Sequence, residues 1–92
     1  MIVPGIYRHY KGGLYVVIGV ARYHDSGAQY VVYHPIAPHD DSDDSVRLNV
    51  RPLTATEDDP DGFLSPAVDT QNGVGVFVPR FVLLTPLQLR SI

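Results

Sequence analysis

The sequence predicts an all-β fold, a small and strongly bent antiparallel sheet of about five to seven short strands that closes into an SH3-like barrel. Eight Gly and eight Pro in 92 residues are too many turn formers for a helical bundle, while 45% hydrophobic residues are too many for a disordered chain. Apolar residues alternate or cluster in short runs, which is typical of strands. Closure into a barrel is expected because it hides the sheet edges. A chain this short builds one core, so we expect a single domain over residues 1–92.

Three β-rich runs open the chain, over residues 6–10, 14–23 and 29–34, and short connections that contain glycine join them. This arrangement predicts a meander of antiparallel strands. In the second run, branched aliphatic side chains occupy positions 14, 16, 18 and 20, so we expect that face of the strand to be buried. Pro35 and Pro38 end the third run because proline has no N–H to donate to a ladder.

A fourth strand is expected over residues 46–51, with positions 46, 48 and 50 facing inward and Arg47, Asn49 and Arg51 facing the other way. Residues 54–66 show no period and predict a long loop. We expect Phe63 and Leu64 to pin this loop to the core.

The last third of the chain contains a hairpin signal and a helix signal. Asn72 and Gly73 separate β-rich runs at 67–70 and 74–78, and Asn-Gly between such runs predicts a tight hairpin. Residues 80–84 follow as a last strand. Thr85 and Pro86 then fit the N-cap and first position of a short helical turn.

The composition excludes several classes of chemistry. Without cysteine the chain has no disulfide, no thiolate metal site and no thiol nucleophile. No stretch is long and apolar enough for a membrane span or signal peptide, so we expect a soluble cytoplasmic protein without membrane association. The net charge of −3 disfavours a generic nucleic-acid binder. The acids concentrate in two segments, 40–44 and 57–61, which are typical of solvated loops.

One long segment carries a resemblance to a known family. Residues 4–21 read PGIYRHYKGGLYVVIGVA, and shorter matches follow in order as VVY at 31–33, VRPL at 50–53 and VPRF at 78–81. This pattern is similar to that of a small bacterial family, domain of unknown function 1653. The resemblance implies a compact, mainly β domain without a settled activity, over about residues 4–84, with residues 85–92 as a C-terminal tail. The chain departs from the family pattern at Asn49, where an aromatic residue usually stands, and in its two acidic segments.

Arginine and tyrosine in the predicted strands suggest a ligand-binding face. An Arg guanidinium grips a phosphate or carboxylate with two parallel hydrogen bonds, and a Tyr ring offers a surface for stacking. The alternative is ordinary β architecture, in which Arg stacks on aromatic rings or pairs with a loop Asp. The candidate ligand-binding residues are Tyr7, Arg8, His9, Tyr10, Tyr33, Arg51 and Arg80.

Catalytic and metal sites are not indicated. The four histidines, His9, His24, His34 and His39, lack metal-ligand spacing, and no nucleophile elbow or phosphate loop occurs. We therefore predict no catalytic residue, no metal and no cofactor, and an accessory module that binds a small anionic ligand or a protein. The alternatives are a small hydrolase or nucleotide-processing enzyme, which would need a His–carboxylate pair in a cleft, and a structural homodimer. In that dimer the apolar C-terminal segment would pair with its copy; otherwise it folds back on its own barrel.

Overall fold

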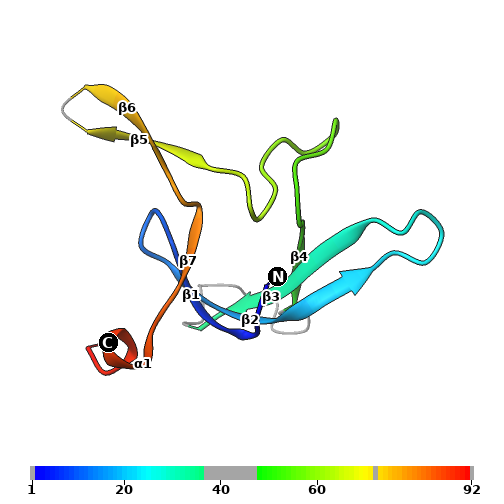
Figure 1. The fold of residues 1–92 in the computed structure, drawn as a ribbon, viewed down its shortest axis with the longest axis horizontal. Helices are drawn as coiled ribbons and strands as arrows, with labels where there is room; N and C mark the ends of the chain where they lie inside the picture. Colours follow the sequence, from blue (N-terminus) through cyan, green and yellow to red (C-terminus); the bar gives the residue numbers. More distant parts are fainter. Residues whose placement is uncertain (1, 37–47, 72, 92) are drawn as a thin grey trace, which may run out of the picture.

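A computed structural model describes residues 2–36, 48–71 and 73–91 and confirms the all-β class. A sheet in the order β4-β3-β2-β1-β7 and a separate hairpin β5-β6 contain only antiparallel pairs (Figure 1). The elements are β1 (Gly5–His9), β2 (Leu14–Arg22), β3 (Gln29–Pro35), β4 (Asn49–Pro52), β5 (Ala67–Gln71), β6 (Val74–Val78), β7 (Phe81–Leu83) and the one-turn helix α1 (Pro86–Leu89).

The predicted meander is confirmed, but the predicted barrel closure is wrong. Strands β1 to β4 follow one another in the sheet, and β7 returns to pair with β1. Within the described ranges, β4 and β7 are the two edges of this sheet and do not pair with each other. The loop of residues 53–66 covers one face of the sheet instead, and the β5–β6 hairpin diverges from it (Figure 1). Two antiparallel sheets therefore replace one closed barrel.

The face of β2 that packs on the core differs from the expected one. Val17 is 1% exposed and pairs with the buried Tyr33, so positions 14 and 16, which alternate with it, lie on the other face. Ile18 is the extra residue of a β-bulge and is 50% exposed, and the alternation shifts after it, so that position 20 lies opposite the buried Val31. The expectation that positions 14, 16, 18 and 20 form one buried face is therefore wrong.

The core lies on one face of the five-stranded sheet, which we call the front face. Its buried members are Tyr7, Val17, Val31, Tyr33 and Phe63. Arg51 pairs with Val31 in register and so lies on the front face, while Val50 is exposed on the other face. The expectation that Val50 faces inward and Arg51 outward is therefore wrong. The loop that covers the front face contacts Arg51 there. Residues 46 and 47 lie outside the described part of the chain.

Phe63 holds the long loop against the sheet, as predicted, whereas Leu64 is exposed. The Phe63 N–H donates to the Pro52 carbonyl at 2.7 Å, and the Leu64 N–H donates to the Leu53 carbonyl at 3.0 Å. The Phe63 ring stacks on Phe81 at a centroid distance of 4.3 Å and meets Tyr7 edge-on at 5.4 Å. One loop residue anchors the segment, and its neighbour points to solvent.

The hairpin and the helix cap are confirmed at the predicted positions. Strands β5 and β6 flank the Asn-Gly step; Gly73 has φ of 78°, a conformation that glycine adopts without strain, and Asn72 lies outside the described residues. The Thr85 side chain accepts from the Gln88 N–H at 3.2 Å, and the Gln88 side chain accepts from the Thr85 N–H at 2.8 Å. Leu84 is buried and its N–H donates to the Ile6 carbonyl at 2.9 Å, so the chain runs along β1 up to the start of the tail.

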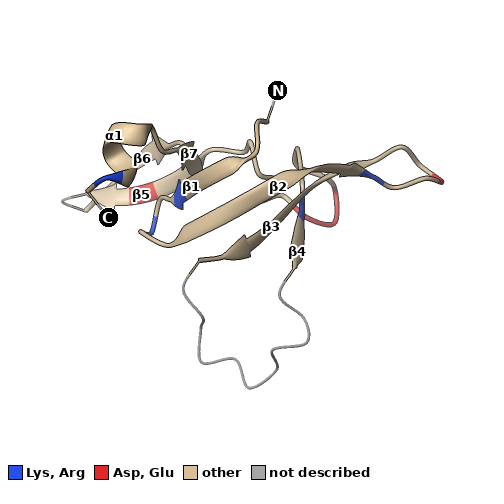
Figure 2. Ribbon diagram, turned by 90° about the horizontal axis from the view of Figure 1, so that it is seen from below, with Lys and Arg blue, Asp and Glu red and all other residues tan. Residues whose placement is uncertain are grey.

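The described acidic residues lie mainly in turns and loops. Figure 2 shows them in the β2–β3 turn, in the loop before β5 and on β5, and the acidic segment 40–44 lies outside the described residues. The α1 helix is too short to cross a membrane, and the described ranges hold no other helix. The Cα radius of gyration is 14.4 Å, against about 12 Å for a compact chain of this length. The β5–β6 hairpin and the hairpin of β2 and β3 project from the core (Figure 1).

Candidate functional site

Aromatic rings gather around His9 at the end of β1. His9 pairs with Phe81 of β7. Tyr15 of β2 pairs with Tyr7, which is two residues before His9 on β1, so Tyr15 lies on the same face as His9. The His9 ring centroid is 4.6 Å from Tyr10, 5.0 Å from Phe81 and 6.3 Å from Tyr15. These four rings are partly buried, and together they form an aromatic surface at one end of the front face.

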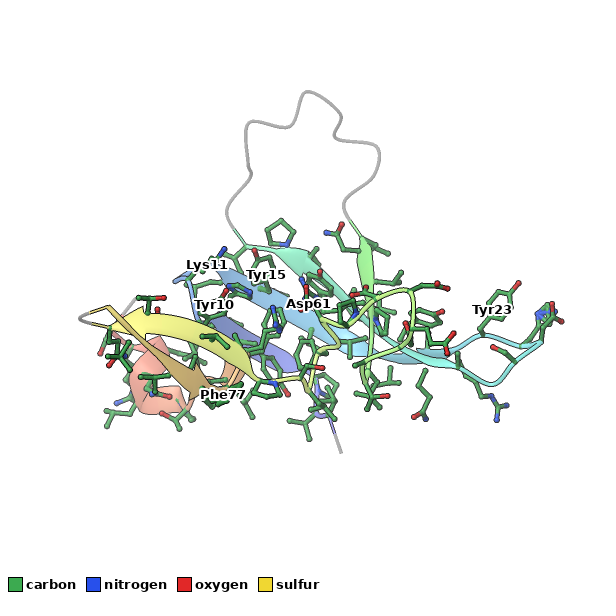
Figure 3. The ribbon with its side chains drawn as sticks, turned by 90° about the horizontal axis from the view of Figure 1, so that it is seen from above. Tyr10, Lys11, Tyr15, Tyr23, Asp61 and Phe77 are labelled. Atoms are coloured by element: carbon green, nitrogen blue, oxygen red, sulfur yellow. The ribbon has the colours of Figure 1, made fainter. Side chains whose placement is uncertain are left out.

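Three cationic side chains surround this surface, and each comes from a different part of the chain. The Arg51 guanidinium carbon of β4 lies 5.4 Å from the Phe81 ring centroid. The Lys11 ammonium from the β1–β2 turn and the Arg80 guanidinium, which follows β6, lie 5.7 and 5.8 Å from the Tyr10 centroid. Figure 3 shows Tyr10, Lys11 and Tyr15 close together over the sheet. We call the group of His9, Tyr10, Lys11, Tyr15, Arg51, Arg80 and Phe81 the cationic-aromatic cluster.

The electrostatic environment lowers the pKa of His9 below its usual value of 6.5. Burial of the ring is the largest cause, and the positive charges of Arg51, Arg80 and Lys11 add to it in that order. The imidazole is therefore neutral at pH 7. The cluster contains three of the seven Lys and Arg residues of a chain whose net charge is −3.

Both arginines also fasten the loop of residues 53–66. Arg51 Nη1 donates to the Asp61 carbonyl at 2.9 Å. Arg80 Nε donates to the Ser65 carbonyl at 3.3 Å, and its Nη2 donates to the Asp61 carboxylate at 3.2 Å and to the Pro66 carbonyl at 3.4 Å. These contacts orient the guanidinium groups, and Asp61 offsets part of their charge. The structural alternative raised by the sequence, in which arginine stacks on rings and pairs with a loop Asp, therefore describes real contacts of Arg51 and Arg80.

The predicted ligand-binding residues divide into three groups. His9, Tyr10, Arg51 and Arg80 come together in the cluster. Tyr7 and Tyr33 belong to the core; the Tyr7 hydroxyl donates to the Val3 carbonyl at 2.8 Å, and the Tyr33 ring meets Tyr15 edge-on at 5.5 Å. Arg8 points to the opposite face of the sheet, because it alternates with Tyr7 and His9 along β1.

Sequence reasoning left three members of the cluster out of the candidate set, namely Lys11, Tyr15 and Phe81. Tyr15 pairs with Tyr7 across the tight turn between β1 and β2. This short connection is the sequence signal that could have placed Tyr15 beside the predicted residues of β1. Phe81 follows Arg80 directly and becomes a cluster residue only because β7 pairs with β1, a long-range contact that short sequence periods do not show.

Arg8 lines an open pocket of about 430 Å³ that adjoins the cationic-aromatic cluster and shares His9 and Tyr10 with it. Val82 and Leu84 of the β7 segment and Gln88 and Ser91 of the tail form its other walls, together with His9 and Tyr10. The predicted site residues thus contribute to two different surfaces.

The described histidines do not form a catalytic or metal-binding arrangement. His24 Nε2 and the Asp25 carboxylate are 2.6 Å apart, but both are exposed in the β2–β3 turn. His34 Nδ1 lies 3.0 Å from the Pro35 carbonyl. In the part of the chain that the structure describes, no three His, Asp or Glu side chains approach as metal ligands. His39 lies outside that part.

Comparisons with known proteins identify relatives without a described activity. A family model for proteins of unknown function, DUF1653, matches residues 5–58. A crystal structure of a DUF1653 protein from Bordetella bronchiseptica is similar over 92% of this chain and 94% of that chain, with 27% identity and a TM-score of 0.61. No match is found among curated proteins.

Proposed function

The chain belongs to the DUF1653 family, and we propose that it is a small binding module whose cationic-aromatic cluster recognises a phosphate- or carboxylate-bearing ligand that also has a flat ring. The observation that carries this proposal is the convergence of Lys11, Arg51 and Arg80 on partly buried rings. A negatively charged chain with three cations around one aromatic surface presents a locally favourable potential for an anion.

The chemistry of each group suits a ligand with an anionic end and a planar end. A guanidinium has five N–H donors, and the loop contacts use one nitrogen of Arg51 and two of Arg80, so both retain donors. Because the loop carbonyls already orient both side chains, less rotamer entropy is lost when a ligand binds. His9 Nδ1 accepts from the Lys11 backbone N–H at 3.2 Å, so the neutral ring has its Nε2–H left to donate to a ligand. Tyr10 and Phe81 offer ring surface for stacking.

Lys11 is the residue whose substitution tests the proposal most cleanly. It lies in the exposed turn between β1 and β2, and its ammonium contacts the Tyr10 ring, so Lys11→Gln removes a charge without opening the core. Arg22 at the far end of β2 is exposed and carries the same charge. Arg22→Gln is therefore a matched control for a general change in net charge.

The experiment is isothermal titration calorimetry with inorganic phosphate, a nucleoside monophosphate and benzoate. We expect at least one probe to bind the native chain and to bind Lys11→Gln about three- to tenfold more weakly, with Arg22→Gln unchanged. The affinity should fall as KCl is raised. Equal losses in both variants would indicate unspecific attraction, and no binding of any probe to the native chain would refute the proposal.

The described geometry does not favour the hydrolase alternative. His9 is surrounded by three cations and aromatic rings, and within the described ranges the pair of His24 and Asp25 is exposed at a turn instead of lying in a cleft. The hydrolase considered from the sequence needs a histidine that a carboxylate orients toward a substrate site.

A further inference from the structure

The β5–β6 hairpin exposes apolar side chains that the rest of its chain does not cover. Among the described elements, neither the five-stranded sheet nor α1 approaches β5 or β6 closely (Figure 1). Phe77 is 76% exposed, and Val68, Val74 and Val76 are also exposed. Phe77 projects from the hairpin in Figure 3. A two-stranded hairpin is at best marginally stable alone in water, so this hairpin requires a further contact.

The outer edge of β6 is suited to pairing with another strand. Its sequence, VGVFV, has no charge and no proline, and among the described strands β6 pairs with β5 alone, on one side. Proteins usually protect such an edge with charges or cover it. The outer edge of β5 differs, because that strand carries Asp69, and two β5 edges brought together would oppose two carboxylates. The uncharged outer edge of β6 is therefore the edge at which pairing with a second copy of the chain is favoured.

The sequence of β6 is nearly symmetric about Val76, which suits pairing with itself. In an antiparallel pair centred there, Val76 lies opposite the partner's Val76, and Val74 opposite the partner's Val78. Phe77 then lies opposite the partner's Gly75, where its ring covers a position without a side chain. In a hairpin closed by two residues the pair at the turn exchanges hydrogen bonds, so Gly75 and Phe77 direct their backbone groups to the outer edge. These two residues are the ones that face each other across the proposed pair.

The apolar area at the β6 edge agrees with a weak dimer. With about 200 Å² for a phenylalanine and about 150 Å² for a valine, the exposed fractions of Phe77, Val74 and Val76 amount to at most about 300 Å² of apolar surface on β6. Interfaces are about 60% apolar, so this corresponds to at most about 500 Å² per chain, or about 1,000 Å² in total. That value lies below the standard range of about 1,200–2,000 Å², where weak and transient complexes are found.

We propose that a second copy of this chain pairs with β6 across a two-fold axis and forms a four-stranded sheet in the order β5-β6-β6-β5. This proposal does not depend on the ligand site. It differs from the dimer considered from the sequence, which used the C-terminal segment: in the structure Leu84 is buried against the same chain, and only the short helix α1 follows.

Sedimentation equilibrium over about 5–500 µM measures the mass, since interfaces of this size and polarity give affinities around the micromolar range. We expect the native chain to approach twice its 10.1 kDa mass at high concentration. Val76→Lys and Val76→Glu should each be monomeric, because like charges meet at the two-fold axis, and a mixture of the two should recover the dimer. Recovery on mixing also excludes misfolding of the single variants.

Two control variants locate the interface. Val20→Lys changes a valine with the same 39% exposure on β2, and Leu87→Lys changes an exposed residue of α1. Both should remain dimeric. A monomeric native chain at all concentrations would overturn the proposal, as would a Val76→Lys variant that stays dimeric or a Leu87→Lys variant that dissociates.

Discussion

Replacing Phe63 with alanine should separate the long loop from the sheet. Phe63 is 3% exposed and contacts Phe81 and Tyr7 through its ring, while its neighbour Leu64 is 57% exposed. Truncation of a buried phenylalanine costs about 3–5 kcal/mol, from lost burial and the cavity left behind. A chain of this length has about 5–14 kcal/mol of stability in total, and its core has only five buried residues in one cluster. Phe63→Ala should therefore remove about a fifth or more of the stability.

The assay is urea unfolding followed by tyrosine fluorescence and circular dichroism, since the chain has six tyrosines and no tryptophan. For a domain of this size, the expected loss corresponds to a drop in Tm of at least about 12 °C. Leu64→Ala is the matched control and should cost less than about 1 kcal/mol. Phe63→Leu keeps most of the volume and should remain folded if the alanine variant does not. Equal, small effects of Phe63→Ala and Leu64→Ala would show that the loop is not packed on the sheet.

Two further predictions concern the loop and the ligand site. Gly62→Ala should destabilise by about 1–3 kcal/mol, since a Cβ there would clash with the Thr54 carbonyl carbon, whereas Gly19→Ala has open space and should change the Tm little; similar Tm values would refute the close approach. The lowered pKa of His9 means that the unfolded chain binds a proton first, so stability should fall as the pH drops below about 6.5 toward the folded-state pKa. A His9→Gln variant should lose this part of the pH dependence in urea unfolding, and an unchanged profile would contradict the assignment.

Local signals in the sequence predicted the local structure. The first three strands, the Asn-Gly hairpin and the Thr85 cap depend on contacts between near neighbours, so periodicity and turn chemistry reveal them. The expected buried face of β2 is wrong because the core forms on the side of Val17, opposite to positions 14 and 16, and the bulge at Ile18 then shifts the alternation for the rest of the strand. Barrel closure was also wrong, because closure depends on whether distant edges meet, and the loop that carries Phe63 covers the sheet instead.

The candidate site was predictable only in part for a related reason. Composition and strand preference indicated that Arg and Tyr would share a face, and Arg51 and Arg80 do lie on the same aromatic surface. Arg8 was included because it is near His9 in sequence, but alternation along β1 places it on the opposite face. Phe81 was left out because its place beside His9 requires β7 to pair with β1 from 70 residues away.

The central claim, that the cationic-aromatic cluster binds an anion, is tested most directly by the pKa of His9. An NMR titration would follow the imidazole signals with and without inorganic sulfate at matched ionic strength, because sulfate keeps its charge where phosphate titrates. We expect His9 to titrate below 6.5 without sulfate and at a higher pH with it, since a bound anion favours the imidazolium. A His9 pKa that sulfate leaves unchanged would contradict the account.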